Sequence, residues 1–134
     1  MVNISDFDQL DDGTLGINVQ AQSLVTISNC FQEPDKLHQG QIIAINHWPQ
    51  QPMSQTVEQL ALRLENVFND NPDAKQLYPQ TNFNCANWVC ARWLELLPFN
   101  PTLKAMFFNP NSFEQAIELL GTVVLAQKAT VQAQ

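Results

Sequence analysis

The sequence predicts an α+β fold in which an antiparallel β meander precedes a unit of three to four helices. Apolar and polar residues alternate along much of residues 1–48, which is typical of strands with one buried face. From Ser54 onward the apolar residues recur with the 3.6-residue period of an amphipathic helix. Pro and Asn-Pro pairs then divide the second half of the chain into short helical segments.

Four strands are expected in the first part of the chain. Asp11-Asp12-Gly13 predicts a hairpin turn, because Gly accepts the positive φ that such turns require. A polar loop is expected over residues 32–39, and Pro49 ends the last strand. The expected strands begin around Val2 and Ile4 and then cover residues 15–19, 24–30 and 41–48.

A four-stranded meander leaves two open edges, and nothing in residues 1–48 has the character of edge protection. Unpaired edges offer backbone donors and acceptors to another chain. We therefore expect a homodimer that forms through the open sheet edges.

The helical segments are bounded by capping and proline signals. Residues 54–68 form the first predicted helix, with Thr56 and Gln59 as a capping box, and residues 70–80 read as a loop. The remaining predicted helices cover residues 84–97, which Pro98 ends, residues 100–109 between two Asn-Pro pairs, and residues 112–124, where Ser112 and Gln115 form a second capping box.

Composition disfavours several classes of function. The formal net charge is −7 with only 6 basic residues, which argues against a nucleic-acid surface built on clustered Lys and Arg. No apolar run approaches the ~20 residues that span a bilayer, and no signal peptide is visible, so no membrane partner is expected. The spacing of Cys85 and Cys90 fits neither a zinc knuckle nor a redox pair, so we expect a reduced, cytoplasmic protein, with Cys90 packed in the core.

No catalytic constellation is evident in the sequence. There is no phosphate-binding Gly-rich loop, and His38 is expected to be a solvated side chain in the polar loop. The acidic residues around the first turn could in principle bind a metal, but Asp is common in turns for its own backbone chemistry. We predict a protein that is not an enzyme, with no cofactor, no metal and no catalytic residue.

Apolar side chains exceed what one buried stripe can accommodate. Residues 105–108 place Met106, Phe107 and Phe108 at consecutive helical positions, so this helix is either wedged between two layers or displays a ring. Exposed apolar patches usually mark binding surfaces. Together with two aromatic residues near loop ends, this gives four predicted polypeptide-binding residues: Phe31, Trp48, Phe107 and Phe108.

Two segments, in this order, resemble the amino-terminal substrate-binding domain of Lon proteases and the stand-alone bacterial proteins built from it. Residues 6–19, DFDQLDDGTLGINV, are similar to the strand–turn–strand of that family. Residues 86–120 are similar to its helical unit, with Leu97-Pro98 ending one helix, Lys104 in a short helix and Asn109-Pro110 before the last helix. Residues 21–24 depart from the Gly and basic–aromatic run that usually follows the second of these strands.

The resemblance implies a domain organisation. Residues 1–53 would form part of a PUA-like β-barrel, residues 54–126 the helical unit of the same domain, and residues 127–134 a tail. The family's first strand and Phe-Pro loop have no counterpart, so the resemblance also implies truncation at the amino terminus.

The resemblance further implies a non-catalytic module that recognises unfolded or damaged polypeptide or serves as a protein-interaction domain. The ATPase and Ser/Lys protease domains of Lon have no counterpart here, so proteolysis is not carried over, although the family is associated with ATP-dependent peptidases. Two alternatives stay open: a hydrolase function exerted through a partner protease, and RNA binding through a PUA-like fold.

Overall fold

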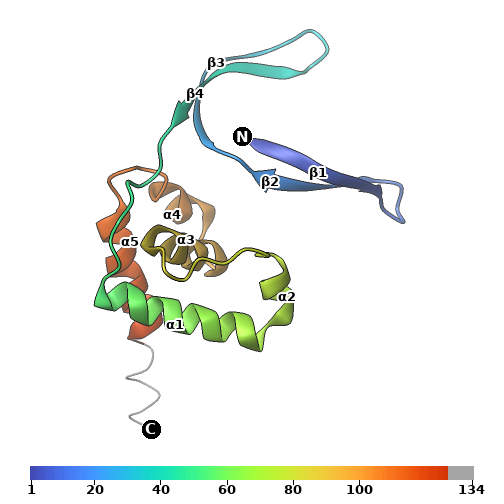
Figure 1. Cartoon of the computed structure of the whole chain (residues 1–134). Helices are drawn as coiled ribbons and strands as arrows, with labels where there is room; N and C mark the ends of the chain where they lie inside the picture. Colours follow the sequence, from blue (N-terminus) through green and yellow to red (C-terminus); the bar gives the residue numbers. More distant parts are fainter. Residues whose placement is uncertain (127–134) are drawn as a thin grey trace. The chain divides into compact units, whose positions relative to one another are not determined.

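The computed structural model describes residues 1–126 of the chain, which form two compact units. The first unit is Met1–His47 and the second begins at Trp48 (Figure 1). The units divide before Trp48 rather than after residue 53, because Trp48 belongs to the core of the helical unit. The predicted α+β class is confirmed, and the predicted tail, 127–134, lies outside the described residues.

The first hairpin pairs β1 (Val2–Gln9) with β2 (Leu15–Ala21) in antiparallel register. Its turn is closed by two backbone hydrogen bonds, from Gly13 N to Leu10 O (2.9 Å) and from Leu10 N to Thr14 O (2.8 Å). Gly13 has φ 84°, which confirms the predicted use of this glycine. The Asp12 carboxylate accepts hydrogen bonds from the backbone and the hydroxyl of Thr14 and so fixes the turn.

The second hairpin pairs β3 (Leu24–Gln32) with β4 (His38–Ile45) and repeats the same turn. Lys36 N donates to Glu33 O (2.8 Å), and the Asp35 carboxylate accepts from Leu37 N (3.0 Å). Lys36 has φ 70° and stands where the first hairpin has Gly13. The predicted polar loop is shorter than expected, and His38 begins β4 rather than lying in that loop.

These four strands form two separate two-stranded sheets instead of one continuous meander. Neither hairpin supplies the other with a third strand, and no side chain of residues 1–47 is buried. An isolated two-stranded hairpin is marginally stable in water because it buries little apolar surface. The first unit therefore lacks a hydrophobic core of its own.

The second unit is a compact set of helices. Figure 1 shows α3 and α5 lying against α1, and each of these three helices contacts the other two. The elements are α1 (Gln55–Asp70), α2 (Pro72–Gln76), α3 (Ala86–Leu96), α4 (Pro101–Met106), α5 (Phe113–Leu120) and a π-helical turn, η1 (Gly121–Leu125).

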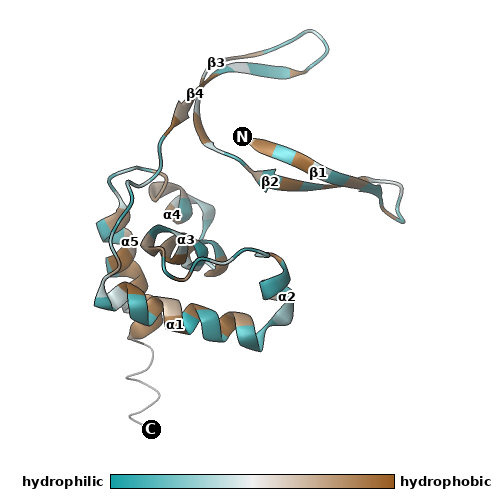
Figure 2. Cartoon of the chain, viewed as in Figure 1, coloured by the Kyte–Doolittle hydropathy of each residue, from teal (hydrophilic) through white to brown (hydrophobic). Residues whose placement is uncertain are grey.

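The core of this unit is aliphatic at its centre and aromatic at its margin. Figure 2 shows the apolar residues of α1 alternating with polar ones along the helix, as its amphipathic pattern requires. Cys90 is fully buried, as predicted. The largest fully buried side chains are Val57, Leu60, Leu64, Val89, Cys90 and Leu120.

Local capping chemistry sets where the helices begin. The Ser54 side chain caps α1 by accepting from Val57 N, so the predicted capping box at Thr56 is wrong by two residues. Asn100 caps α4 as expected, accepting from Leu103 N at 2.8 Å with Pro101 at the first helical position. The predicted loop over residues 70–80 contains α2, in which Pro72 occupies the first turn, where proline is tolerated.

Among residues 1–126, no helix has the length and apolar character needed to cross a membrane.

Candidate polypeptide-binding surface

The structure separates the four predicted binding residues into two pairs. Phe31 on β3 and Phe108 after α4 are 53% and 52% exposed, whereas Trp48 and Phe107 are each only 6% exposed. Phe31 belongs to the hairpin unit and Phe108 to the helical unit. Of the four predicted residues, only Phe31 and Phe108 thus present a ring to solvent.

Trp48 and Phe107 are structural residues of the helical core, so the expectation that they lie on a surface is corrected. The Trp48 ring contacts Phe113 edge-to-face, with the ring centroids 5.1 Å apart. Its Nε1 donates a 2.9 Å hydrogen bond to Ser112 Oγ, which in turn donates to the backbone O of Phe107 and of Asn109. Ser112 therefore connects the segment before α1 to the corner before α5, and its side chain does not form the predicted capping box.

The first hairpin displays an apolar face to solvent, although the alternation of its residues predicts a buried face. The alternation of Leu15, Ile17 and Val19 along β2 correctly predicts that these side chains share one face. It does not predict that this face is exposed. Figure 2 shows apolar and polar segments alternating along β1 and β2. Six large side chains of this face are between 51% and 70% exposed: Val2, Ile4, Phe7, Leu15, Ile17 and Val19.

A β-bulge at Ser5 keeps the face of β1 uniform. Ile4 pairs with Val19 and Asp6 pairs with Asn18, so Ser5 is an extra residue in the ladder. Strict alternation through Ser5 would place Phe7 on the face opposite Ile4. The bulge absorbs one residue, and Phe7 consequently pairs with Ile17 on the same face as Ile4.

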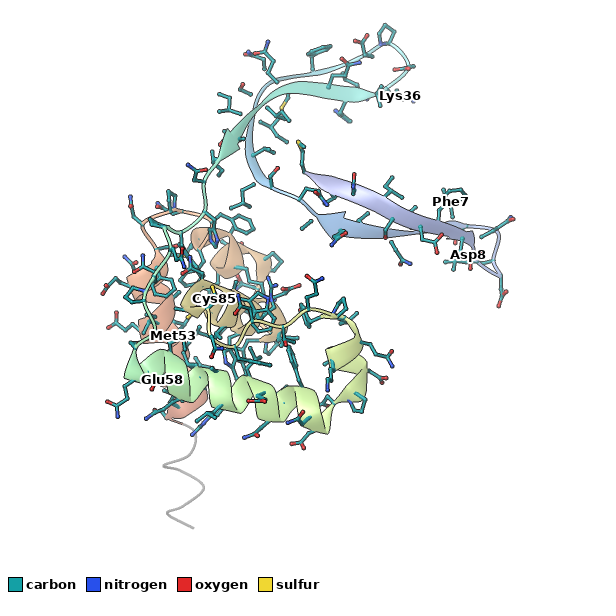
Figure 3. The ribbon with its side chains drawn as sticks, viewed as in Figure 1. Phe7, Asp8, Lys36, Met53, Glu58 and Cys85 are labelled. Atoms are coloured by element: carbon teal, nitrogen blue, oxygen red, sulfur yellow. The ribbon has the colours of Figure 1, made fainter. Side chains whose placement is uncertain are left out.

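Acidic side chains occupy the opposite face of the same hairpin. Asp6 and Asp8 alternate with Phe7, and Figure 3 labels Phe7 and Asp8 as neighbours on β1. Asp11 and Asp12 stand at the tip, where hydrogen bonds from Thr14 hold the pKa of Asp12 below its usual value. The hairpin thus has one apolar face without charge and one polar, acidic face.

The second hairpin is apolar on both faces near its base. Leu24 pairs with Ile45 and Thr26 with Ile43 on one face, while Ile27 pairs with Ile42 on the other. Beyond them a bulge at Asn29 and Cys30, with Asn29 at φ 51°, brings Phe31 onto the face of Ile43. Strands that are apolar on both faces are typical of pairs covered from two sides, yet Ile27, Ile42 and Ile43 are all more than half exposed.

The helical unit offers a second, smaller apolar feature. A cavity of about 320 Å³ opens between α1, α3 and η1, and Arg63 at its rim donates a hydrogen bond to Val124 O. Its lining is Arg63, Asn66, Val67, Trp93, Leu97, Val123 and Val124. The lining carries no acid–base pair, so the cavity suits apolar contact rather than chemistry.

The helical unit also holds an aromatic cluster around Arg92. The guanidinium carbon of Arg92 lies 5.3 Å from the Tyr78 ring centre and 5.7 Å from that of Trp88, and Nε of Arg92 is 3.0 Å from a Glu95 carboxylate oxygen. Burial, and secondly the Glu95 carboxylate, raise the pKa of Tyr78 to about 12. Arg92 thus already occupies the space between these two rings.

The nucleophilic and metal-binding side chains of the described chain do not form a constellation. Burial raises the pKa of the Cys90 thiol to about 12, which disfavours its reactive thiolate at neutral pH. Over residues 1–126, no three His, Cys, Asp or Glu side chains gather in a way that could hold a metal ion.

The comparisons with known proteins identify a fold. No family model matches the chain, and no curated protein matches it either. Among solved structures, the chain is similar to the crystal structure of a Lon N-terminal domain protein from Xanthomonas campestris, with a TM-score of 0.67 and 20% sequence identity. The match covers 91% of this chain but 64% of that one, so this chain spans less than two thirds of the length of that protein. The chain has a Lon N-terminal domain-like fold.

Proposed function

We propose that this chain is a non-catalytic polypeptide-binding module that uses the exposed apolar surface of its β3–β4 hairpin. The main support is that this hairpin exposes Phe31 and Ile43 on one face and Ile27 and Ile42 on the other. Neither face packs against a hydrophobic core within residues 1–47. Apolar area in contact with water is the main source of affinity for other apolar chains.

The backbone of the hairpin adds a second mode of recognition. β3 and β4 pair only with each other, so the outer edge of each strand lacks a ladder partner within residues 1–126. An extended peptide can add to such an edge, with backbone hydrogen bonds supplying affinity and alternate side chains reaching the apolar face. Unfolded or damaged polypeptide, which exposes both backbone and apolar side chains, is the class of partner that fits.

The charge of the hairpin unit supports a polypeptide rather than RNA as its ligand. Lys36 is its single Lys or Arg, set against an acidic group made of Asp6, Asp8, Asp11, Asp12, Glu33 and Asp35. Phosphate-binding surfaces instead cluster basic side chains. The fold shared with the Lon N-terminal domain protein agrees with a binding module, and peptidase activity would require a partner.

A binding measurement with matched variants tests this proposal. A fluorescently labelled, permanently unfolded polypeptide such as reduced, carboxymethylated α-lactalbumin is titrated with the protein, and anisotropy gives the Kd. Phe31→Ser should weaken binding by about tenfold or more, because an aromatic anchor is worth about 1–2 kcal/mol. Leu77→Ser serves as the control, since Leu77 is 72% exposed in the helical unit and lies outside the proposed surface.

Two results would contradict the proposal. One is that this protein binds the unfolded polypeptide no more tightly than a folded, unrelated protein does. The other is an equal loss of affinity in Phe31→Ser and Leu77→Ser. The same preparation, incubated with casein with and without ATP, reports on peptidase activity, and cleavage by the protein alone would overturn the non-catalytic assignment.

A further inference from the structure

We infer that the apolar face of the β1–β2 hairpin is a self-association surface, on which a second copy of this chain stacks its own β1–β2 hairpin face to face. This inference goes beyond the proposed function, because it assigns a different hairpin and a different partner. It also differs from the edge-paired dimer expected from the sequence. In the stacked arrangement side chains, rather than backbone edges, form the contact.

The area of the face is the first support. Val2, Ile4, Phe7, Leu15, Ile17 and Val19 are each at least half exposed. Five of these side chains are aliphatic and one is aromatic, and at these exposures the six together offer on the order of 600 Å² of accessible surface. Complete stacking of two copies would bury about 1,200 Å², which lies at the lower end of the range for a standard stable protein–protein interface, about 1,200–2,000 Å².

The chemistry of the face is self-complementary. Its cross-strand pairs are Val2 with Ala21, Ile4 with Val19, Phe7 with Ile17, and Gln9 with Leu15, so the face carries no charge. Asp6 and Asp8 lie on the reverse face and would remain in water after stacking. Two identical surfaces can meet in this way without placing like charges against each other, as a two-fold interface requires.

The direction of stacking follows from the position of the remaining charges. Asp11 and Asp12 lie at the turn, at one end of the hairpin. If the two copies stack with their turns at opposite ends, these four carboxylates are separated by the length of the strands, whereas stacking with the turns together would bring them close. A two-fold axis in the plane of the interface, perpendicular to the strands and midway between the Ile4–Val19 and Phe7–Ile17 pairs, gives the first arrangement, with sheets packed about 10 Å apart.

Self-association also supplies the layer that the hairpin lacks. A two-stranded hairpin alone is marginally stable, and no side chain of residues 1–47 is buried. Stacking would cover one side of the strands with a second layer of apolar side chains, which is how β-sandwiches form a core.

Sedimentation velocity at 1–100 µM, in the absence of any polypeptide ligand, tests the inference on the full chain. We expect a dimer with a Kd in the micromolar range or below, and we expect Phe7→Thr/Ile17→Thr to raise that Kd by about 100-fold. Threonine keeps the strand preference at both positions while it removes apolar area. Leu77→Thr, in the helical unit, is the control and should sediment as the unchanged protein.

A second measurement identifies the surface even if the double variant fails to fold. In a mixture of isotopically labelled and unlabelled protein, intermolecular NOEs should connect the Phe7 ring with the methyl groups of Ile4, Ile17 and Val19. A monomer at 100 µM would overturn the inference and would leave this face for a different polypeptide to cover. A dimer that persists in Phe7→Thr/Ile17→Thr without these NOEs would also overturn it, in favour of edge pairing or another surface. Neither measurement depends on the binding of unfolded polypeptide, so the two proposals can fail separately.

Discussion

The substitution Leu64→Ala tests the packing of the helical unit at its centre. Leu64 is 0% exposed on α1, which contacts α3, α5 and η1. Truncation of a buried Leu to Ala costs about 2–5 kcal/mol, and the cost rises with the volume of the cavity that remains. Because α1 packs against α2, α3, α5 and η1, the site has little freedom to collapse, and we expect a loss of about 3 kcal/mol.

Leu62→Ala is the matched control, on the same helix and with the same change of side chain. Leu62 is 63% exposed, so its truncation removes little buried area. Leu and Ala also have similar helix propensities. We expect its free energy of unfolding to change by no more than about 0.5 kcal/mol.

Thermal unfolding followed by tryptophan fluorescence gives both values. Trp48, Trp88 and Trp93 all lie in the helical unit, so the signal reports this unit and not the hairpins. A unit of roughly 80 residues unfolds with an entropy of about 170 cal/mol/K, so a loss of 3 kcal/mol lowers Tm by about 15–20 °C. Equal losses in the two variants, or a loss below about 1 kcal/mol for Leu64→Ala, would refute the assignment of this face of α1 to the core.

Two further predictions concern the hairpin turns and the single tyrosine. Gly13→Ala should destabilise the first turn by about 1 kcal/mol, purely through its positive φ, because nothing lies within 4 Å of an added Cβ. Lys36→Gly should stabilise the second turn by a similar amount, because Lys36 also has a positive φ. Amide hydrogen exchange at Leu10 and Glu33 measures the stability of the first and second turn, respectively. Stability changes of the same sign in the two variants would contradict the shared turn geometry. Tyr78 should titrate at about 12 in the folded protein instead of 10.0, as followed by tyrosinate absorbance, and a folded-state midpoint near 10 would contradict its burial. Since the unfolded chain would lose this proton first, stability should fall as pH rises from about 10 to about 12 and should not fall further above that range on account of Tyr78.

Some element boundaries could be predicted from the sequence, because local chemistry decides them. Asn100 and Pro101 form a cap and a first turn whatever surrounds them, and Gly13 marks a hairpin because few other residues accept its φ. The error at α2 has the same local origin. Residues 70–80 read as a loop, but Pro72 is compatible with a first helical turn and begins α2.

Which apolar residues are buried could not be predicted, because burial depends on contacts between distant segments. Trp48 and Phe31 both stand near strand or loop ends, yet Ser112 and Phe113, more than 60 residues further along, cover the Trp48 ring. Within residues 1–47, no segment does the same for the apolar faces of the hairpins. The face of β2 was correctly identified by alternation, but a periodic pattern states only which side chains share a face and not whether anything covers that face.

The two β-bulges have a consequence for how these strands can change in evolution. Because Ser5 is an extra residue between two correctly paired segments, its removal would leave Ile4 opposite Val19 and Asp6 opposite Asn18. Deletion of Ser5 should therefore preserve the apolar face, while an insertion elsewhere in β1 without a new bulge would move part of the apolar side chains to the opposite, acidic face. A change in the length of β1 at the bulge is thus tolerated, whereas a change that moves its apolar side chains to the other face is not. Homologues would consequently differ by single-residue gaps at Ser5 or at Asn29 more readily than by a charge at Ile4 or Ile17.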